Sequence, residues 1–168
     1  GRYYGKQPEF NKLTILFVQN EAAFNAAKNH EVDVAAVPLA FANETVDGYD
    51  MKLLDSIDVR GMSFPMTNNT GETHKNATVG NNVTADPAIR QALNYGINRT
   101  AIADGALNGL GYPNYDGVAH QLPWYNNESA IPDGDVEKAK QILKDGGWVD
   151  TDGDGIVEKN GLKASITT

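Results

Sequence analysis

The acidic segment at residues 150–158, with the sequence DTDGDGIVE, holds the densest chemistry in this 168-residue chain. Calcium takes six to eight oxygen ligands, and acidic residues at loop positions one, three and five, a glycine at six and a carbonyl at seven match the start of a calcium loop. Gly161 stands where the bidentate glutamate of a helix–loop–helix site would be, which argues against that kind of switch. A polar turn between a helix and a strand is the alternative. The candidate calcium-like ligands are Asp150, Asp152, Asp154, the carbonyl of Ile156, and Glu158.

The remaining metal-binding side chains are scattered along the sequence. His30, His74 and His120 lack metal-ligand spacing. Surface loop histidines are the default interpretation of all three. There is no cysteine, which excludes disulfides, zinc-thiolate sites and cysteine nucleophiles.

Neither an enzyme nor a nucleic-acid-binding protein is expected. The net charge of −8 is unsuited to phosphate backbones. The sequence has no nucleophile-elbow, zinc-protease or phosphate-loop motif. Hydrophobic residues make up 40% and charged residues 21%, which is typical of a globular protein.

Asparagine–x–serine/threonine motifs are unusually frequent. Chance would give about one or two in a chain of this composition. A glycosylated cell-surface protein and an asparagine- and threonine-rich sequence with polar loops are both compatible with this pattern. The motifs begin at Asn43, Asn68, Asn76, Asn82, Asn98 and Asn127.

The first third of the chain predicts a strand–helix–strand unit. Residues 13–18 and 32–37 are rich in β-branched residues and indicate buried strands, and residues 20–29 favour a short helix. A third strand region is expected within residues 52–66. Residues 67–85 are polar and predict a long loop.

Three helices with clear starts are expected after this loop. Asp86 and Pro87 open the first, Asn98 caps a second over 99–107, and Asp135 caps a third that ends at two glycines. Residues 109–127 are rich in glycine, proline, tyrosine and asparagine and predict an irregular connector. A strand is expected to begin at Leu162.

Several of these segments, in order, resemble the extracellular solute-binding proteins of family 5. The resemblance rests on DPAIRQALNYGINR at 86–99, AIADGALNGLG at 101–111, LPWYN at 122–126, DVEKAKQIL at 135–143, and Gly147 with Trp148. It is specific from Asp86 onward and holds only in outline before that residue.

The resemblance implies an α/β fold: a lobe of the type II periplasmic-binding-protein kind, with a mixed sheet flanked by helices, and the start of a second lobe. Residues 1–110 would belong to the first lobe, 111–134 to a hinge connector, and 135–168 to the second lobe. The chain would then be part of a longer protein.

The family further implies a binding component of an ABC importer, located outside the membrane and tethered to the cell surface as a lipoprotein. It would capture a peptide, nickel or a nickel chelate and deliver it to a membrane permease. The third strand region, which ends in residues 60–68, would run along the cleft, and a core strand with methionine and phenylalanine as packing is the alternative. Two aromatic residues after it in the chain could form a stacking wall or cover the hinge. Nickel prefers nitrogen donors, so His74 and His120 near the cleft are candidates for nickel contacts. The ligand-binding candidates are thus Arg60, Met62, Asn68, Trp124 and Tyr125. An extracellular calcium-stabilised interaction domain without a transport role is the alternative.

Overall fold

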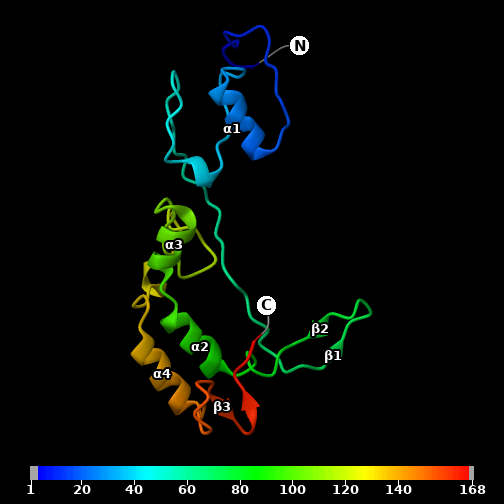
Figure 1. Ribbon diagram of the computed structural model, residues 1–168, viewed down its shortest axis with the longest axis vertical. Coiled ribbons are helices and arrows are strands. Elements are labelled where there is room, and N and C mark those ends of the chain that lie inside the picture. Colours follow the sequence, from blue (N-terminus) through cyan, green and yellow to red (C-terminus); the bar gives the residue numbers. More distant parts are fainter. Residues whose placement is uncertain (1–3, 167–168) are drawn as a thin grey trace. The chain divides into compact units, whose positions relative to one another are not determined.

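The computed structural model describes residues 4–166 (Figure 1). The chain divides into two compact units, one reaching to Leu53 and the other beginning at Leu54. This division does not coincide with the expected lobe boundaries after residues 110 and 134, which stay predictions. No helix among residues 4–166 is long and apolar enough to cross a membrane.

The first unit is organised around one helix, α1 (Asn20–Lys28), as the sequence predicts. Phe24 on α1 is 1% exposed and stacks on Phe41 of the short 3-10 helix η1 (Leu39–Phe41), with ring centroids 4.8 Å apart. The Lys28 ammonium lies 4.2 Å from the Phe24 ring centroid and covers this small core.

The three strands expected in residues 13–18, 32–37 and 52–66 are not formed within the described residues. These segments have no regular secondary structure and join no β-ladder, and Phe17 and Val34 are 93% and 87% exposed. A strand needs a partner for its backbone groups and a layer to cover its apolar face. Residues 4–166 supply no partner strand and no covering layer for these three segments, so the apolar pattern here is not matched by burial.

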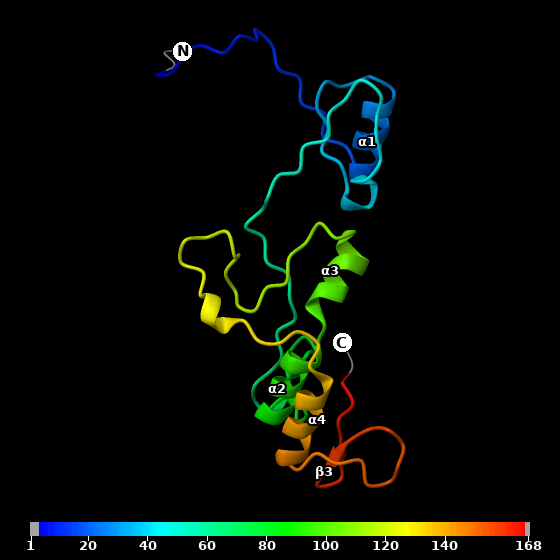
Figure 2. The ribbon, with the colours of Figure 1, turned by 90° about the vertical axis from the view of Figure 1, so that its left-hand side faces the viewer.

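The second unit is built on two helices that pack against each other, side by side in Figure 1 and overlapping in the perpendicular view of Figure 2. They are α2 (Pro87–Gly96) and α4 (Val136–Asp145), and α3 (Arg99–Leu107) follows α2 directly. Asp86, Asn98 and Asp135 accept hydrogen bonds from first-turn N–H groups, which confirms the three predicted helix starts. A 3-10 helix, η2 (Asn127–Ser129), lies within the connector.

Two short antiparallel hairpins complete this unit. The first pairs β1 (Gly71–Glu72) with β2 (Thr78–Val79), inside a segment that was expected to be only a loop. The second pairs β3 (Glu158–Lys159) with β4 (Leu162–Lys163), where a strand was expected. Val83, Ile89 and Trp148 form the buried core between the hairpins and the helices.

Candidate functional site

The segment that carries Arg60, Met62 and Asn68 is exposed but anchored near both ends. The Gln121 side chain donates to the Ser56 carbonyl at 3.3 Å, and the Thr84 hydroxyl donates to the Pro65 carbonyl at 2.8 Å. Thr84 is fully buried and its own carbonyl accepts from Arg90. The backbone of this segment is therefore held while its side chains face solvent.

Individual side chains on this segment are accessible to a ligand. Met62 is 67% exposed. The Arg60 guanidinium has only a loose ion pair with Asp58, at 3.8 Å between two largely exposed side chains. A pair of this kind contributes little to stability, so the guanidinium can exchange it for another carboxylate at small cost.

Gly80 positions Asn68, and sequence reasoning missed it. The Asn68 and Thr67 carbonyls lie so close to Gly80 that a Cβ there would overlap both, and Gly80 has a φ of +83°. The only sequence signal was an isolated glycine in a polar segment, which does not by itself indicate a close backbone approach.

Trp124 and Tyr125 lie in a turn of the connector, where the Tyr125 N–H donates to the Leu122 carbonyl. Trp124 is 68% exposed. Within residues 4–166, no hydrogen bond, ion pair or ring contact joins either aromatic residue to Arg60, Met62 or Asn68. The described residues thus present the five ligand candidates as separate groups, of which Tyr125 is half-buried and the other four are exposed.

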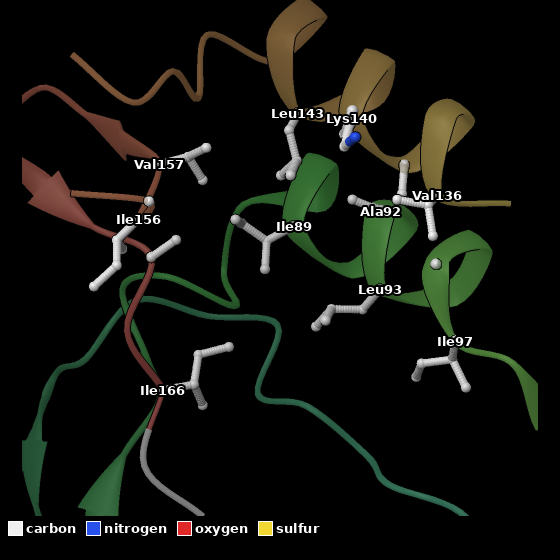
Figure 3. Close-up of a pocket in the computed structure, with 14 residues that line it drawn as sticks. Ile89, Ala92, Leu93, Ile97, Val136, Lys140, Leu143, Ile156, Val157 and Ile166 are labelled. Atoms are coloured by element: carbon white, nitrogen blue, oxygen red, sulfur yellow. The ribbon is translucent and has the colours of Figure 1, made fainter. Parts of the chain in front are cut away.

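An apolar pocket of about 550 Å³ lies in a different part of the second unit (Figure 3). Ile89 and Leu93 of α2 line it with Leu143 of α4, and Val157 and Ile166 of the C-terminal segment lie opposite. Lys140 is the one charged side chain in its lining. It contains none of the five ligand candidates.

The acidic segment folds into a loop closed by its own carboxylates. Asp150 accepts from the Gly153 and Gly155 N–H groups at 2.7 and 2.9 Å. Carboxylate oxygens of Asp150, Asp152 and Glu158 lie within 4.8 Å of one another, so these three can contact one cation.

Asp154 and Ile156, the other two calcium-like candidates, are placed differently. The Asp154 carboxylate is an ion-pair partner of Lys163, which also contacts Asp152 at 2.8 Å. Hydrogen bonding from Lys163 lowers the pKa of Asp154, and hydrogen bonding to Asp152 and Asp154 raises the pKa of Lys163. The Ile156 N–H donates to Asp154. Lys163 therefore offsets part of the mutual repulsion of the loop carboxylates.

Glu158 links the loop to the β3–β4 hairpin. Its Oε1 accepts from the Thr151 N–H at 2.8 Å and from the Thr151 hydroxyl. Its Oε2 is buried and has no hydrogen-bond partner among the described residues. A buried carboxylate oxygen without a donor favours a cation beside it.

A second polar centre lies at the start of α2, where the sequence indicated only a helix cap. Asp86 accepts from the Ala88 N–H, from the Trp148 indole at 3.0 Å and from the Lys159 ammonium at 2.7 Å. Partial burial opposes ionisation of Asp86, but these hydrogen bonds and the Lys159 charge outweigh it and lower the pKa of this carboxyl.

The histidines do not gather within the described residues. His30 stacks on Tyr49, and His120 contacts the Tyr112 ring edge-on at 4.7 Å between centroids. His74 lies in the exposed turn between β1 and β2. No group of three metal-binding side chains in residues 4–166 includes a histidine.

Comparison with known proteins finds relatives along the whole chain. Protein XP55 of Streptomyces lividans is 30% identical over 168 residues, which cover 98% of this chain and 28% of that protein. The oligopeptide-binding protein AppA of Bacillus subtilis is 38% identical over 90 residues, or 52% of this chain and 16% of AppA. The nickel-binding periplasmic protein of Escherichia coli is 36% identical over 83 residues, or 49% of this chain and 16% of that protein.

The solved structure of AppA in complex with a nonapeptide matches 86% of this chain and 27% of that chain, with a TM-score of 0.53 and 26% identity. This similarity gives the chain the α/β fold of a type II periplasmic-binding-protein lobe. The chain spans less than a third of the length of these relatives. The sequence model of one protein family, the bacterial extracellular solute-binding proteins, family 5 (middle part), matches residues 1–168. The chain belongs to this family.

Proposed function

We propose that this chain is part of the solute-binding component of an ABC importer, which captures a peptide outside the membrane and delivers it to the membrane permease. The observation that carries the proposal is that AppA, an oligopeptide-binding protein, is similar to this chain in both sequence and structure. The permease and a lipid tether at the cell surface are part of the proposal. No finding supports a calcium-stabilised interaction domain or an enzyme instead.

The exposed segment around Arg60 supports a role as one wall of the binding cleft. A peptide has a terminal carboxylate, which a guanidinium can bind through two parallel hydrogen bonds. Arg60 is weakly paired, Met62 offers an adaptable apolar surface, and Asn68 is exposed. We propose these three as ligand contacts, with Trp124 and Tyr125 as a stacking surface from the connector at residues 111–134.

Nickel or a nickel chelate is the second candidate ligand, because one relative is a nickel-binding periplasmic protein. Nickel prefers imidazole and other nitrogen donors. His74 and His120 do not gather with other such donors in the described part of the chain. We therefore place peptide first and nickel second.

Calorimetry of the full-length protein with separate titrations of mixed short peptides, nickel, and nickel with histidine tests this order. We expect heat of binding from the peptides. Arg60→Ala should weaken peptide binding about tenfold, the effect of losing about 1.4 kcal/mol from a charge-assisted contact. Lys138→Ala, which removes the same charge from exposed α4, is the matched control. Absence of peptide binding in the full-length protein would refute the proposal.

We also propose that the loop at residues 150–158 binds a hard cation such as calcium, in a structural role. Asp150, Asp152 and Glu158 would supply the first carboxylate ligands. Asp152 and Asp154 both pair with Lys163, so a cation would compete with this ammonium for their carboxylates. The Ile156 carbonyl is proposed as a further ligand. The cation would balance the negative charge of the Glu158 carboxylate, whose buried Oε2 accepts no hydrogen bond from residues 4–166.

Thermal unfolding with and without millimolar calcium tests the cation site. Calcium should raise the melting temperature of the wild type, and Asp150→Asn should abolish that increase because it removes a ligand and loosens the loop. Lys163→Gln should enlarge the increase, since the competing ammonium is removed. An unchanged melting temperature in calcium, with Asp152→Ala as stable as the wild type, would refute the site.

A further inference from the structure

Six asparagine–x–serine/threonine motifs occur in the chain, and the asparagine of each motif is exposed to solvent. The motif is the acceptor signal for N-linked glycans, which are attached at surface positions of exported proteins. Modification uses the asparagine side-chain amide and requires the hydroxyl two residues later. A motif in the folded protein is therefore usable only where both groups are accessible and unengaged.

Three motifs fail this requirement because their polar groups hold the fold together. In the Asn82 motif, Thr84 is fully buried and bonded to the Pro65 carbonyl. In the Asn98 motif, Asn98 caps α3 through the Ala101 N–H, and the Thr100 hydroxyl bonds to Asp133.

The Asn127 motif fails for the same reason. The Ser129 hydroxyl contacts the Asn126 carbonyl at 2.7 Å and Asp116 at 3.3 Å. Half of the motifs are thus explained by structural hydrogen bonds, and their presence needs no modification.

The Asn76 motif has the opposite character. Asn76 lies at the end of the turn that joins β1 to β2, in the left-handed conformation with φ of 57°. The turn is held by Thr73, which bonds through its backbone and hydroxyl to the N–H groups of Asn76, Lys75 and Ala77. Within residues 4–166, the side chains of Asn76 and Thr78 make no hydrogen bond, and both residues are exposed.

The position of the turn also favours access. Figure 1 shows the β1–β2 hairpin ending in a loop that lies away from α2 and α4 of the same unit. Asn43 and Asn68 keep exposed side chains too, but the Asn68 backbone is packed against Gly80. Among the six motifs, only the Asn76 motif lies on the turn of a described hairpin. A glycan attached there would not cover the helices or the core.

We propose that Asn76 is an N-glycosylation site of the exported protein. The donor is an oligosaccharide linked to a lipid through pyrophosphate. The Asn76 Nδ2 forms a bond to the anomeric carbon of the first sugar, while the bond from that carbon to the phosphate oxygen breaks. The lipid pyrophosphate leaves with the bonding electrons, and the proton lost from the amide passes to a base of the transferase.

Mass spectrometry of the full-length protein recovered from the cells that naturally make it tests the proposal. Trypsin releases residues 76–90, which contain both Asn76 and Asn82 and no internal lysine or arginine. Electron-transfer fragmentation of this peptide assigns any sugar to one of the two asparagines. We expect the glycan on Asn76 and an unmodified Asn82. An unmodified Asn76, or a glycan on Asn82 instead, overturns the proposal.

Substitutions at Thr78 provide a matched pair, because this exposed residue of β2 has no hydrogen bond through its hydroxyl in the described structure. Thr78→Ala removes the signal and should abolish the modification of Asn76. Thr78→Ser keeps a hydroxyl and should retain it. Since both variants leave the backbone pairing in place, equal melting temperatures show that loss of the glycan is not loss of folding. Retention of the glycan in Thr78→Ala contradicts the proposal.

Discussion

Asp86 joins three parts of the second unit through one carboxylate. It caps α2, accepts from the Trp148 indole and pairs with Lys159 of β3. Both Trp148 and Asp86 are largely shielded from solvent, with Trp148 at 2% exposure. Loss of this carboxylate would leave a buried indole N–H and a lysine without their acceptor, which costs more than loss of a cap alone.

Asp86→Ala should therefore destabilise the chain by about 2–3 kcal/mol, the sum of a lost cap and a lost buried acceptor. Asp135→Ala is the matched control, because the Asp135 side chain caps α4 through the Lys138 N–H and has no comparable partners among residues 4–166. We expect about 1 kcal/mol for the control. Urea unfolding followed by tryptophan fluorescence measures both values, and equal losses would show that Asp86 acts only as a cap.

Asp86 should also contribute to the acid sensitivity of the fold. Its pKa is lowered in the folded chain from an ordinary value of 3.8. The unfolded chain therefore binds the proton more readily, and the stabilisation is complete above pH 3.8 and lost as the pH falls through the lower folded-state pKa.

The comparison with Asp86→Asn isolates this contribution, since asparagine still caps the helix but cannot ionise. The difference in unfolding free energy between the two proteins should be constant near neutral pH and shrink below about pH 4. Urea titrations from pH 7 to pH 3 measure this difference. A difference that stays constant to pH 3 would contradict the lowered pKa.

At the residue scale, the sequence predicts caps but not their distant partners. Asp86 was recognised from the proline that follows it, a local signal. Trp148 and Lys159 lie 62 and 73 residues further along the chain, and nothing local indicates that they converge on Asp86. The same is true of Lys163, which pairs with both Asp152 and Asp154 from the hairpin strand that follows the loop.

At the scale of elements, the packing of α2 against α4 depends on small residues. A Cβ on Gly146, at the end of α4, would overlap the Ala88 Cβ of α2. Gly96 of α2 approaches Ala139 of α4, where an added Cβ would lie at 3.3 Å. Close approach of two helices requires small side chains at the contact points.

Gly146→Ala should destabilise the chain by about 1–3 kcal/mol, because the helices must separate to relieve the overlap. Its backbone is right-handed, with φ of −75°, so backbone strain does not contribute. Gly105→Ala in α3 is the control, since no atom lies within 4 Å of the added Cβ. It should be neutral or stabilising by up to about 1 kcal/mol, given the helix preference for alanine. Thermal unfolding by circular dichroism distinguishes the two, and a neutral Gly146→Ala would rule out the close contact.

The helices were predictable here, whereas among the expected strands only the one beginning at Leu162 is formed in the described residues, for a physical reason. A helix satisfies its backbone within its own segment, so local caps and periodicity suffice to place α1, α2, α3 and α4. A strand depends on a partner that can be far away. Residues 13–18 have the composition of a buried strand, yet Leu13 and Phe17 remain 82% and 93% exposed in the described structure.

At the scale of the whole molecule, the two units differ in the extent of the packing that stabilises each of them. The first has one small aromatic core, whereas the second has helix packing, two hairpins and the Trp148 core. α2 and α4, which lie on either side of the expected connector at residues 111–134, pack directly against each other, and the expected lobe boundaries stay predictions. Sequence alone could not reveal this contact because the residues between them predict only an irregular connector.

A shortened chain of residues 54–168 should therefore fold without the rest. Its core residues, the Asp86 contacts and the α2–α4 contact all lie within this range. We expect cooperative unfolding, with a midpoint within about 2 °C of the main transition of the 168-residue chain, since a loss of 1 kcal/mol would shift it by more than that. Trp148 fluorescence and helical circular dichroism measure the transition. A shortened chain without the fluorescence of a buried tryptophan would not be folded. Because it keeps every core residue of the second unit, that result would mean that this unit needs the first to fold.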